Sequence, residues 1–596
     1  MDQREEQKRL IRLIVALFSI AVLMALALWI RWPITKTDAF SNEDVAGITY
    51  NADLLRQGKV PMVDSVEMKA PGSFFITWAA WSIWGRSLNV LECLGVAWSI
   101  LAALGIFFTA RALFGPKHAF VAGLLYVVYS PISDDMTVNY NAWMVCAYIW
   151  SAFFVVMALK RGKLGYFVLC GVTLTIAGLC KRQGAVLFPL YALLIWFAPR
   201  LGTPNDWARY NRRYAMLGFF VGLASGFVPI FLFYFAKGNA LAFVKNYFFS
   251  QSGWRYVGGE LSFGDKVSRL RDAFTGFWQF MLLPTLLASM TLVATATRPR
   301  RGDRLILALL TGMFVLSFLG LSLGFRFYRG YYIQALPALV LLSVHPEGPL
   351  FRWFGAGLWP LHPSRRVLRV AKVGIMLFFV FLAARPGVAM LKKERDKRGN
   401  VNHVRREATR LAGIIVKNTT KNDRIWVWGR WAWPIYFHAD RLSPTRYYKV
   451  IDVITTNLTN TWRRRTMMTR FVPHGPEIEI ARELSETKPA YIITAVNEDH
   501  QGWIGFEDLL AKEYEENKIA GITAFHLYER KGLIKKTAPK PKLQPKSRPL
   551  RRAPSPQLRP RKSPATRWFG YRLAWKTVAP RVNQSAGWLQ GWFGTR

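Results

Sequence analysis

Long apolar runs alternate with short connections along the first 391 residues of the sequence. A helix of about 20 apolar residues spans the hydrocarbon core of a bilayer, and runs near this length recur too often here for a soluble protein. The pattern predicts about eleven transmembrane helices and therefore a polytopic α-helical membrane protein. The predicted spans are Leu13–Ile30, Leu88–Ala110, Ala119–Ile132, Ala142–Leu159, Leu164–Leu179, Gly184–Ala198, Tyr214–Phe235, Ala273–Ala294, Leu305–Leu323, Tyr331–Val344 and Val373–Leu391.

Basic residues in the connections predict the orientation of these helices. The first run follows the basic segment 4–12, and no small-residue cleavage site follows it, so we interpret it as a retained helix with a cytoplasmic N-terminus. If successive helices then cross the membrane in alternating directions, every predicted inner loop carries Lys or Arg, in agreement with the positive-inside rule. The same count leaves everything after about residue 392 outside the cytoplasm.

The first predicted outer loop, residues 31–87, is the longest polar stretch among the early spans and contains several acids. A short helix is predicted to begin at Asp44, with Ser41 or Asn42 as its N-cap, and to end at Gly58. Taken alone, Asp44 is more typical of a helix start than of a catalytic group, because acids are favoured in the first turn. Apolar residues at helical spacing predict that this helix lies on the membrane surface; they are Val45, Ile48, Ala52 and Leu55.

Two short outer loops carry cations on the side of the membrane where the topology disfavours them. One contains Lys181 and Arg182, and the other is the segment 326–329, Arg-Phe-Tyr-Arg. A single cation at this depth is more often a side chain that extends to phospholipid headgroups. Two clusters on one face indicate instead a binding site for an anion, because charges at the membrane boundary need a partner.

The part of the chain after residue 391 is expected to divide in two. Residues 392–532 are predicted to form a small extracytoplasmic α/β domain. After Gly532, Pro, Lys and Arg dominate and no acid occurs, so residues 533–596 are predicted to be a basic disordered tail. The elements expected in the α/β domain are strands at 424–429, 489–495 and 523–529 and helices at Glu477–Ser485 and Phe506–Glu516.

The charge and the remaining motifs restrict the classes of function that the sequence allows. The formal net charge is +44, and the tail supplies a large part of it. On the outer face the expected partner of such a tail is anionic lipid or an envelope polymer rather than nucleic acid, and a solvated tail of no required function is the alternative. No Gly-rich nucleotide loop and no zinc-type His or Cys spacing occurs. The four cysteines lie in or beside predicted spans, so they do not indicate a redox compartment.

A pattern in the first outer loop resembles a known family. D-x5-Y-x7-G-x2-P runs from Asp44 to Pro61, and K-x-P follows at Lys69. This resembles the first outer loop of the GT-C glycosyltransferases, specifically the protein O-mannosyltransferase and aminoarabinose-transferase group of bacterial membranes. Segments 179–194, 324–342 and 423–448 resemble further parts of these proteins, in the same order and on one membrane face. The resemblance covers roughly residues 10–530.

The resemblance implies a GT-C-like transmembrane domain over residues 1–391, with its catalytic loop at 31–87, and a polyprenyl-phosphate sugar as donor. It implies Asp44 as the general base that accepts the proton of the acceptor hydroxyl. It also implies that outer cations hold the donor phosphate. The substrate-binding candidates are Lys181, Arg182 and Arg326, with Lys69 and Tyr328 beside them.

The sequence departs from the family pattern at the second acid. The family has an acidic pair led by Asp in the first loop, whereas here Glu43 precedes Asp44 and an apolar residue follows it. In the next outer loop Asn141 stands where a second acid is expected, which leaves Asp134 and Asp135 as candidate substitutes. The resemblance therefore leaves a divalent metal open as a cofactor, although enough cations at the phosphate would make a metal unnecessary.

The resemblance further implies a hexosyl- or pentosyltransferase of the bacterial inner membrane that serves the cell envelope, for example lipopolysaccharide. It would pass the sugar, with inversion, to a hydroxyl of a lipid, glycan or protein acceptor. One alternative is a transporter or flippase of lipid-linked sugars, which should show inverted repeats or broken helices. Another is an oligosaccharide polymerase or ligase. No convincing internal repeat is visible, and a large outer domain after the last span favours the transferase.

Overall fold

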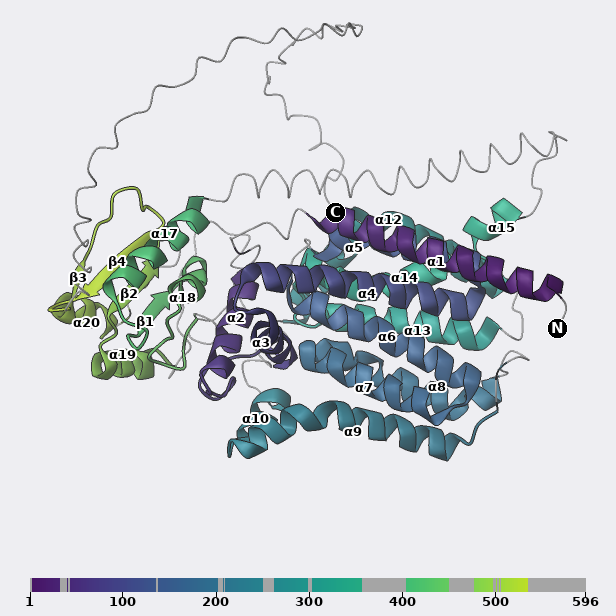
Figure 1. The fold of residues 1–596 in the computed structure, drawn as a ribbon, viewed down its shortest axis with the longest axis horizontal. Coiled ribbons are helices and arrows are strands. Elements are labelled where there is room, and N and C mark those ends of the chain that lie inside the picture. The colour runs from purple at the N-terminus through teal and green to yellow at the C-terminus, as the bar shows by residue number, and fades with distance from the viewer. Residues whose placement is uncertain are drawn as a thin grey trace, which may run out of the picture. The chain divides into compact units, whose positions relative to one another are not determined.

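A computed structural model shows the fold of the chain (Figure 1). The predicted span Val373–Leu391, the connection 450–475 and the predicted tail beyond residue 533 lie outside the residues it describes. The described residues are 3–32, 40, 43–134, 138–201, 207, 209–249, 262–297, 303–355, 403–449, 476–496, 500, 503 and 505–533.

Helices account for nearly all the regular structure before residue 356. In chain order they are α1 (Gln3–Arg31), α2 (Glu43–Arg56), α3 (Gly72–Trp84), α4 (Leu88–Phe114), α5 (Pro116–Asp134), α6 (Tyr140–Arg161), α7 (Leu164–Cys180), the 3-10 helix η2 (Arg182–Leu187), α8 (Phe188–Leu201), α9 (Arg212–Ala236), α10 (Ala240–Phe248), α12 (Phe263–Thr297), α13 (Asp303–Ser322), the 3-10 helix η3 (Arg329–Gln334), α14 (Leu336–Ser343) and α15 (Pro349–Gly355).

The long helices pack side by side as a bundle (Figure 1). α7 contacts both α6 and α9, and α4 contacts both α5 and α6. α7 and α9 approach so closely that a Cβ atom on Gly171 would lie 2.3 Å from the Phe219 carbonyl oxygen, and one on Gly222 would lie 2.0 Å from the Val168 carbonyl oxygen. Glycine is needed at such crossings because close backbone approach, rather than a hydrophobic driving force, holds helices together in lipid.

Every predicted span up to residue 344 falls on one or two of these helices. Among the described residues, six helices are long and apolar enough to cross a membrane, and α7 and the η2–α8 pair are shorter apolar helices. The class of polytopic helical membrane protein is thereby confirmed, whereas the number of spans and their orientation stay predictions. The six long helices are α1, α4, α6, α9, α12 and α13.

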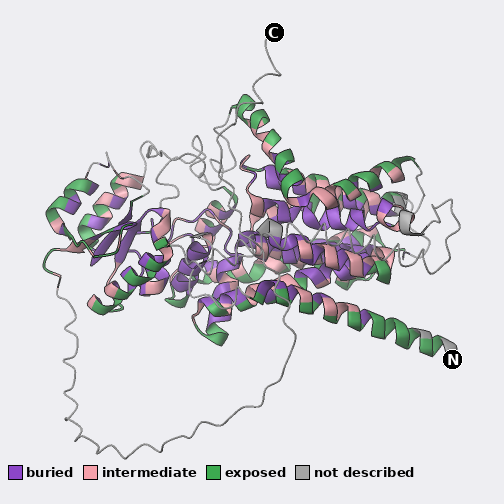
Figure 2. Cartoon of the chain, turned by 90° about the horizontal axis from the view of Figure 1, so that it is seen from above, coloured by how far each residue is buried: buried purple, intermediate pink, exposed green. Residues whose placement is uncertain are grey.

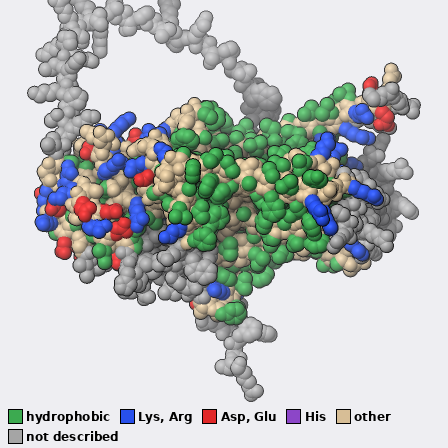
Figure 3. Space-filling model, turned by 90° about the horizontal axis from the view of Figure 1, so that it is seen from below, with side chains coloured by type: hydrophobic (Ala, Val, Ile, Leu, Met, Phe, Trp, Pro, Cys, Tyr) green, Lys and Arg blue, Asp and Glu red, His purple; other side chains and the backbone are tan. Residues whose placement is uncertain are grey.

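The surface of the helical part is apolar. Hydrophobic side chains cover the middle of the bundle in the view of Figure 3, while charged side chains gather over the part that contains the sheet and, mainly as Lys and Arg, at the opposite end of the bundle. Large apolar side chains are exposed on α1 and α9, for example Phe18 (68% exposed) and Leu217 (59%). Buried residues concentrate inside the bundle (Figure 2). An apolar surface over a packed interior is the distribution expected of a protein surrounded by lipid.

The first outer loop folds into α2 and α3. α2 begins at Glu43, and Gly58, in the left-handed conformation with φ 74°, follows its end as the sequence predicts. The predicted position of this helix on the membrane surface is wrong. Its apolar residues, such as Ile48 and Ala52, are fully buried, because α2 packs against α3 on one side and the outer helix α18 (Pro434–Ala439) on the other.

The described residues between 403 and 533, called the outer domain after their predicted location, form a small α/β structure around a four-stranded sheet of order β1-β2-β4-β3. β1 and β2 are parallel, and β4 is antiparallel to both β2 and β3. Every residue of β1 and β2 is buried, which explains why both strands appear in the sequence as continuous apolar runs. All three predicted strands are present. The elements are α17 (His403–Asn418), β1 (Ile425–Trp428), the 3-10 helix η4 (Arg430–Ala432), α18, α19 (Pro476–Thr487), β2 (Tyr491–Ala495), α20 (Phe506–Glu513), β3 (Tyr514–Glu516) and β4 (Phe525–Arg530).

One predicted helix is shorter than expected. The segment Phe506–Glu516 divides into α20, which ends at Glu513, and strand β3. The Glu- and Lys-rich composition favours a helix throughout. Tyr514 is nevertheless buried, and it pairs with Arg530 of β4 at the edge of the sheet. A tertiary pairing thus overrides the local preference over the last three residues.

Candidate active site

The outer domain holds α2 in place around Asp44, which lies in the first turn of that helix. The ring of Tyr50 stacks on Tyr448 with centroids 4.0 Å apart and planes 5° from parallel. The Tyr50 hydroxyl accepts a hydrogen bond from the backbone N–H of Ser443 at 3.2 Å. Contacts from residues almost 400 positions away in the sequence therefore determine where the carboxylate stands.

Arg430 of the outer domain faces Asp44 directly. It begins η4 immediately after β1, and its Nη2 lies 3.8 Å from Asp44 Oδ1. Gly429 makes this turn possible, because its φ is 96° and a Cβ atom there would lie 2.5 Å from the Ala495 Cβ. The Asp44 side chain remains 37% exposed. The turn thus brings a cation to a carboxylate that a substrate can still reach.

Four cations control the ionisation of Asp44. Burial alone would raise the pKa of Asp44, but Arg430 and three lysines outweigh it and hold this pKa below its ordinary value. The carboxylate is therefore ionised at neutral pH and available as a proton acceptor. The three lysines are Lys69, Lys449 and Lys181.

A cavity of about 400 Å³ lies between the first outer loop and the turn that joins α7 to η2. Lys69, Lys181 and Arg182 line it together with apolar side chains, and its size is that of an ordinary ligand site. The segment after Lys69 packs directly on the end of α7, since a Cβ atom on Gly72 would lie 2.7 Å from the Leu179 backbone. Tyr140 also lines the cavity, and its hydroxyl would lie 3.7 Å from a Cβ atom on Gly47, one turn after Asp44, so the cavity is next to the helix that carries the carboxylate.

Lys181 follows α7 as its C-cap and is half-buried. Its Nζ donates a hydrogen bond to Asn141 Oδ1 at 2.5 Å and lies 3.9 Å from the centroid of the Tyr331 ring. Burial lowers the pKa of Lys181 and the charge of Lys69 lowers it further, while Asp44 opposes both effects. An anion placed between the two lysines would remove the repulsion between them, so this pair is suited to a phosphate.

Arg182 is the second cation of this turn. Its Nη2 donates to the backbone oxygen of Asn246 at 2.8 Å, and the guanidinium lies 5.4 Å from the centroid of the Tyr247 ring. The buried Nε makes no hydrogen bond with the residues that the structure describes. A buried donor of this kind normally has a partner, which is consistent with a ligand in the cavity that Arg182 lines.

The second predicted cation cluster is joined to the first through aromatic rings. Tyr328 packs edge-to-face on Tyr331 with centroids 5.6 Å apart, and Tyr331 is the ring beneath Lys181. Arg326 precedes Tyr328 by two residues in the same short turn, and its side chain is partly exposed. The structure thus places an aromatic ring of the second segment against Lys181, whereas Arg326 and Tyr328 are not among the described residues that line the cavity.

The structure describes Asn141 of the second predicted outer loop but not the side chains of its two candidate acids. Asp134 ends α5, but its side chain and the whole of Asp135 lie outside the described residues. Asn141, which replaces the expected acid, is the hydrogen-bond acceptor of Lys181. A neutral amide accepts this bond without cancelling the ammonium charge, so Lys181 keeps its attraction for an anion.

Sequence reasoning missed three residues of this site: Arg430, Glu67 and Lys449. Lys449 Nζ and Glu67 Oε2 form a buried ion pair at 2.5 Å between the outer domain and the first outer loop. Glu67 precedes Lys69 by two residues, and this proximity to the K-x-P motif is the one signal that could have indicated it. Arg430 and Lys449 lie among many other basic residues of the outer domain, so nothing local distinguishes them.

The acids near this site do not fit a divalent metal. Hard divalent cations require several oxygen ligands at short distance. Here Arg430 faces Asp44, and Lys449 binds Glu67, so each carboxylate already has a cation beside it. In the part of the chain that the structure describes, no group of three or more His, Cys, Asp or Glu could hold an ion.

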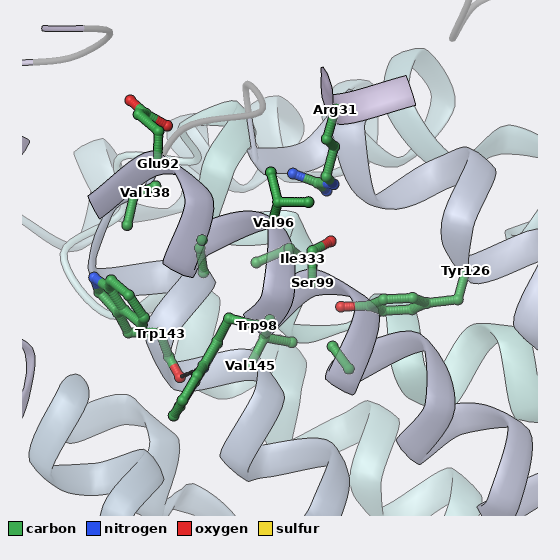
Figure 4. A pocket seen from close by; sticks show the side chains of 13 residues that line it. Arg31, Glu92, Val96, Trp98, Ser99, Tyr126, Val138, Trp143, Val145 and Ile333 are labelled. Atoms are coloured by element: carbon green, nitrogen blue, oxygen red, sulfur yellow. Dashed lines mark hydrogen bonds between the residues drawn. The ribbon is translucent and has the colours of Figure 1, made fainter. Parts of the chain in front are cut away.

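A second cavity, of about 20 Å³, lies among α1, α4, α5 and α6 (Figure 4). Arg31 points into it and donates a hydrogen bond to Ser130 Oγ at 3.2 Å. Beside it, Trp98 Nε1 donates to the backbone oxygen of Trp143 at 3.0 Å. The volume suffices for about one water molecule. This cavity is therefore a buried polar contact between helices and is too small for a substrate.

Solved membrane glycosyltransferases share the fold. ArnT from Cupriavidus metallidurans bound to undecaprenyl phosphate has a TM-score of 0.54 and 14% identity, over 85% of this chain and 97% of ArnT. The apo oligosaccharyltransferase of Archaeoglobus fulgidus has a TM-score of 0.53 and 12% identity, over 80% of this chain and 69% of that one. AglB from the same archaeon, in complex with an inhibitory peptide and a dolichol-phosphate, has a TM-score of 0.52 and 12% identity, over 87% and 74%. The fold is the GT-C fold.

Within that class, residues 68–229 match the family model described as dolichyl-phosphate-mannose-protein mannosyltransferase. The matched region contains Lys69 and the turn with Lys181 and Arg182, which are three of the cavity residues. No curated protein matches the sequence at a significant level. The predicted resemblance to the protein O-mannosyltransferase and aminoarabinose-transferase group is thus confirmed.

Proposed function

We propose that this protein transfers a sugar from a polyprenyl-phosphate donor to a hydroxyl group of a lipid, glycan or protein acceptor. One observation carries the proposal: Lys69, Lys181 and Arg182 line a single cavity next to the ionised Asp44. The solved relatives support a lipid phosphate as the leaving group, because ArnT is bound to undecaprenyl phosphate and AglB to a dolichol-phosphate.

The cavity cations would bind the donor phosphate and stabilise its charge. Lysine acts as a mobile point charge and arginine as a planar donor of two hydrogen bonds, so Lys181 and Arg182 complement each other. The phosphate gains negative charge as the bond to the sugar breaks, and preorganised cations stabilise that charge most strongly in the transition state. The apolar lining of the same cavity suits the first isoprene units of the lipid.

Asp44 would act as the general base. The oxygen of the acceptor hydroxyl attacks the anomeric carbon, and the bond from that carbon to the phosphate oxygen breaks. The electron pair of that bond remains on the departing polyprenyl phosphate, and the hydroxyl proton moves to the Asp44 carboxylate. Attack from the side opposite the phosphate inverts the anomeric configuration. Base catalysis of this type contributes about 10²–10⁴-fold.

We also propose that the site faces the outside of the bacterial inner membrane, with the N-terminus in the cytoplasm. The basic inner loops support this orientation. In a background without native cysteines, Ile478→Cys on the exposed side of α19 should react with an impermeant thiol reagent in intact spheroplasts, and Arg161→Cys should react only after lysis. The opposite result would invert the proposed topology.

Purified protein in lipid nanodiscs, incubated with a panel of polyprenyl-phosphate sugars and acceptors, tests the activity. A transferase releases polyprenyl phosphate and adds one hexose or pentose to the acceptor, so mass spectrometry of both products identifies the sugar and the acceptor together. A flippase would leave the donor intact and move it between leaflets. A polymerase or ligase would transfer a whole glycan chain.

A further inference from the structure

The buried ion pair between Glu67 and Lys449 joins two segments that are far apart in the sequence. The side chain of Glu67 is 0% exposed and that of Lys449 is 4% exposed. Lys449 Nζ lies 2.5 Å from Glu67 Oε2, and the Tyr448 hydroxyl donates to the same oxygen at 2.6 Å. Two donors from the outer domain therefore hold one carboxylate oxygen of the first outer loop.

The second oxygen of the same carboxylate holds a residue of the donor cavity. Glu67 Oε1 accepts a hydrogen bond from the backbone N–H of Lys69 at 2.9 Å. The adjacent backbone is fixed to the outer domain as well, because the N–H of Val66 donates to the Arg446 oxygen at 2.8 Å. The start of the Lys69 side chain is thus positioned by a carboxylate that the outer domain holds.

The same group of side chains packs against the turn of α2 that contains Asp44. Gly47, one turn after Asp44, has so little space that a Cβ atom there would lie 3.3 Å from the Tyr448 hydroxyl and 3.9 Å from Glu67 Oε2. Asn51, a further turn along, donates to the Tyr448 hydroxyl at 3.0 Å. The group therefore lies between the helix of Asp44 and the segment of Lys69 and contacts both.

Stability alone does not account for an ion pair at this place. Desolvation of two charges costs about as much as their attraction returns, and a well-packed apolar pair is often at least as stable. A hydrogen-bonded carboxylate does, however, specify direction, because each oxygen accepts along defined lines. The pair is therefore better explained by the geometry it imposes than by the stability it adds.

We propose that Glu67 and Lys449 are positioning residues, which hold Lys69 at the separation from Asp44 that sugar transfer requires. The outer domain is then an integral part of the donor site. This inference rests on the proposed function and deepens it, because it states why transfer would fail without contact between the two parts of the chain.

Two double variants separate positioning from folding. Glu67→Gln with Lys449→Met removes both charges but leaves an amide oxygen to accept the Lys69 N–H, while its amide group donates to Tyr448. Glu67→Met with Lys449→Met also removes both charges but leaves no acceptor. Because one net hydrogen bond corresponds to roughly a three- to tenfold change, the donor KM of the second variant should exceed that of the first by this factor. The acceptor KM should be alike in both.

An exposed ion pair of the same domain supplies the control. Lys488 and Glu513 lie 3.0 Å apart and are 45% and 27% exposed. Lys488→Met with Glu513→Gln removes two charges of the outer domain without touching the Lys69 contact, so its donor KM should stay within about twofold of wild type. A large change in this control would mean that any charge loss in the outer domain acts on the donor, and it would overturn the inference.

The outcomes distinguish this inference from the proposed function. Equal donor KM values for the two double variants, or a loss confined to kcat, would overturn the positioning role while wild-type transfer stands. The proposed function itself would be overturned if the wild-type protein released no polyprenyl phosphate and if undecaprenyl phosphate did not raise its Tm. If the Glu67→Met, Lys449→Met variant does not fold, the single variant Glu67→Gln is compared with the double variant Glu67→Gln, Lys449→Met. In the single variant the new amide faces the Lys449 ammonium, so the added Lys449→Met change should lower the donor KM. An unchanged donor KM would overturn the inference.

Discussion

Two turns bring cations to Asp44, one from the helical bundle and one from the outer domain. Lys181 and Arg182 lie where α7 passes into η2, and Arg430 lies where β1 passes into η4. Each turn depends on a glycine in close contact with backbone or a methyl group, Gly184 in the first and Gly429 in the second. The two turns are therefore alike in construction.

The turns differ in what their cations face. Lys181 and Arg182 line the cavity of about 400 Å³, whereas Arg430 is not among the described residues that line it and faces the carboxylate itself. Under the proposed function, Lys181 and Arg182 would therefore bind the donor phosphate, and Arg430 would control the charge of the base. The variants below test this division of roles.

The largest effect is expected for Asp44→Asn. Asparagine keeps the shape and the capping ability of the residue but is not a base, so turnover should fall by about 10²–10⁴-fold while stability changes little. Rates of polyprenyl phosphate release, together with a Tm measurement, check this. Near-normal turnover in a folded variant would exclude Asp44 as the base, and Glu43, Asp134 and Asp135 would have to be tested instead.

A smaller loss, concentrated in donor affinity, is expected for the membrane-side turn. Lys181→Met and Arg182→Met each remove one charged contact to the phosphate, which corresponds to roughly 10–100-fold in kcat/KM for the donor. The KM for the acceptor should not change, because in this scheme these two cations bind the donor phosphate. Steady-state kinetics with each substrate varied in turn measure the two effects. A loss confined to the acceptor KM would contradict the assignment of this turn to the donor.

Arg430→Met should change the pH profile more than the rate. The Arg430–Asp44 pair is 3.8 Å long and the Asp44 side chain is 37% exposed, so its contribution should be near the roughly 0.2–1 kcal/mol of a solvent-accessible pair, and the loss at neutral pH should be under about fivefold. Arg430 is the foremost cation holding the pKa of Asp44 below its ordinary value, and its removal therefore raises that pKa. The ionised carboxylate is the active form, so activity is lost as the pH falls through this pKa. The acid limb of kcat/KM should move to higher pH in the variant.

The matched comparison for the pH profile is Arg430→Lys. Lysine retains the charge, so the acid limb should stay near that of the wild type even if the rate decreases. An acid limb that stays in place for both variants would show that Arg430 does not control the base. An equal shift for Arg182→Met would show that the two turns do not divide their roles.

The smallest effect is expected for removal of the basic tail. Truncation after Leu533 keeps β4, which ends at Arg530, and the partly buried Leu533 side chain that packs on the core. The removed segment has too little apolar content for a core, so basal transfer in nanodiscs should change by less than about twofold. Comparison of vesicles with and without anionic lipid would show whether the tail contributes membrane affinity. A truncated protein that does not insert would contradict the prediction of a dispensable segment.

Much of the fold could be predicted from the sequence because lipid and burial impose strong local patterns. Backbone groups in a bilayer must be satisfied within helices, so the apolar runs up to residue 344 correspond to helices in the structure. The buried strands β1 and β2 appear as apolar runs for a similar reason. Lys181 and Arg182 were noticeable because they interrupt apolar sequence, and Asp44 because its spacing from later residues resembles a family pattern.

Tertiary structure alone decided the environment of these residues. Whether α2 lay on lipid or under protein depended on α18, which is almost 400 residues away, and β3 exists because β4 is beside it. Arg430 and Lys449 carry no local signal, and Glu67 has only its proximity to the K-x-P motif, since a charged residue in a polar segment is ordinary until its partner is known. The sequence by itself determined the helices, the apolar surface of the bundle and the cations that interrupt the apolar runs, because each follows from a residue and its solvent. The pairing of Arg430 with Asp44 and of Lys449 with Glu67 was decided only in three dimensions, because electrostatic partners are defined by distance in space rather than along the chain.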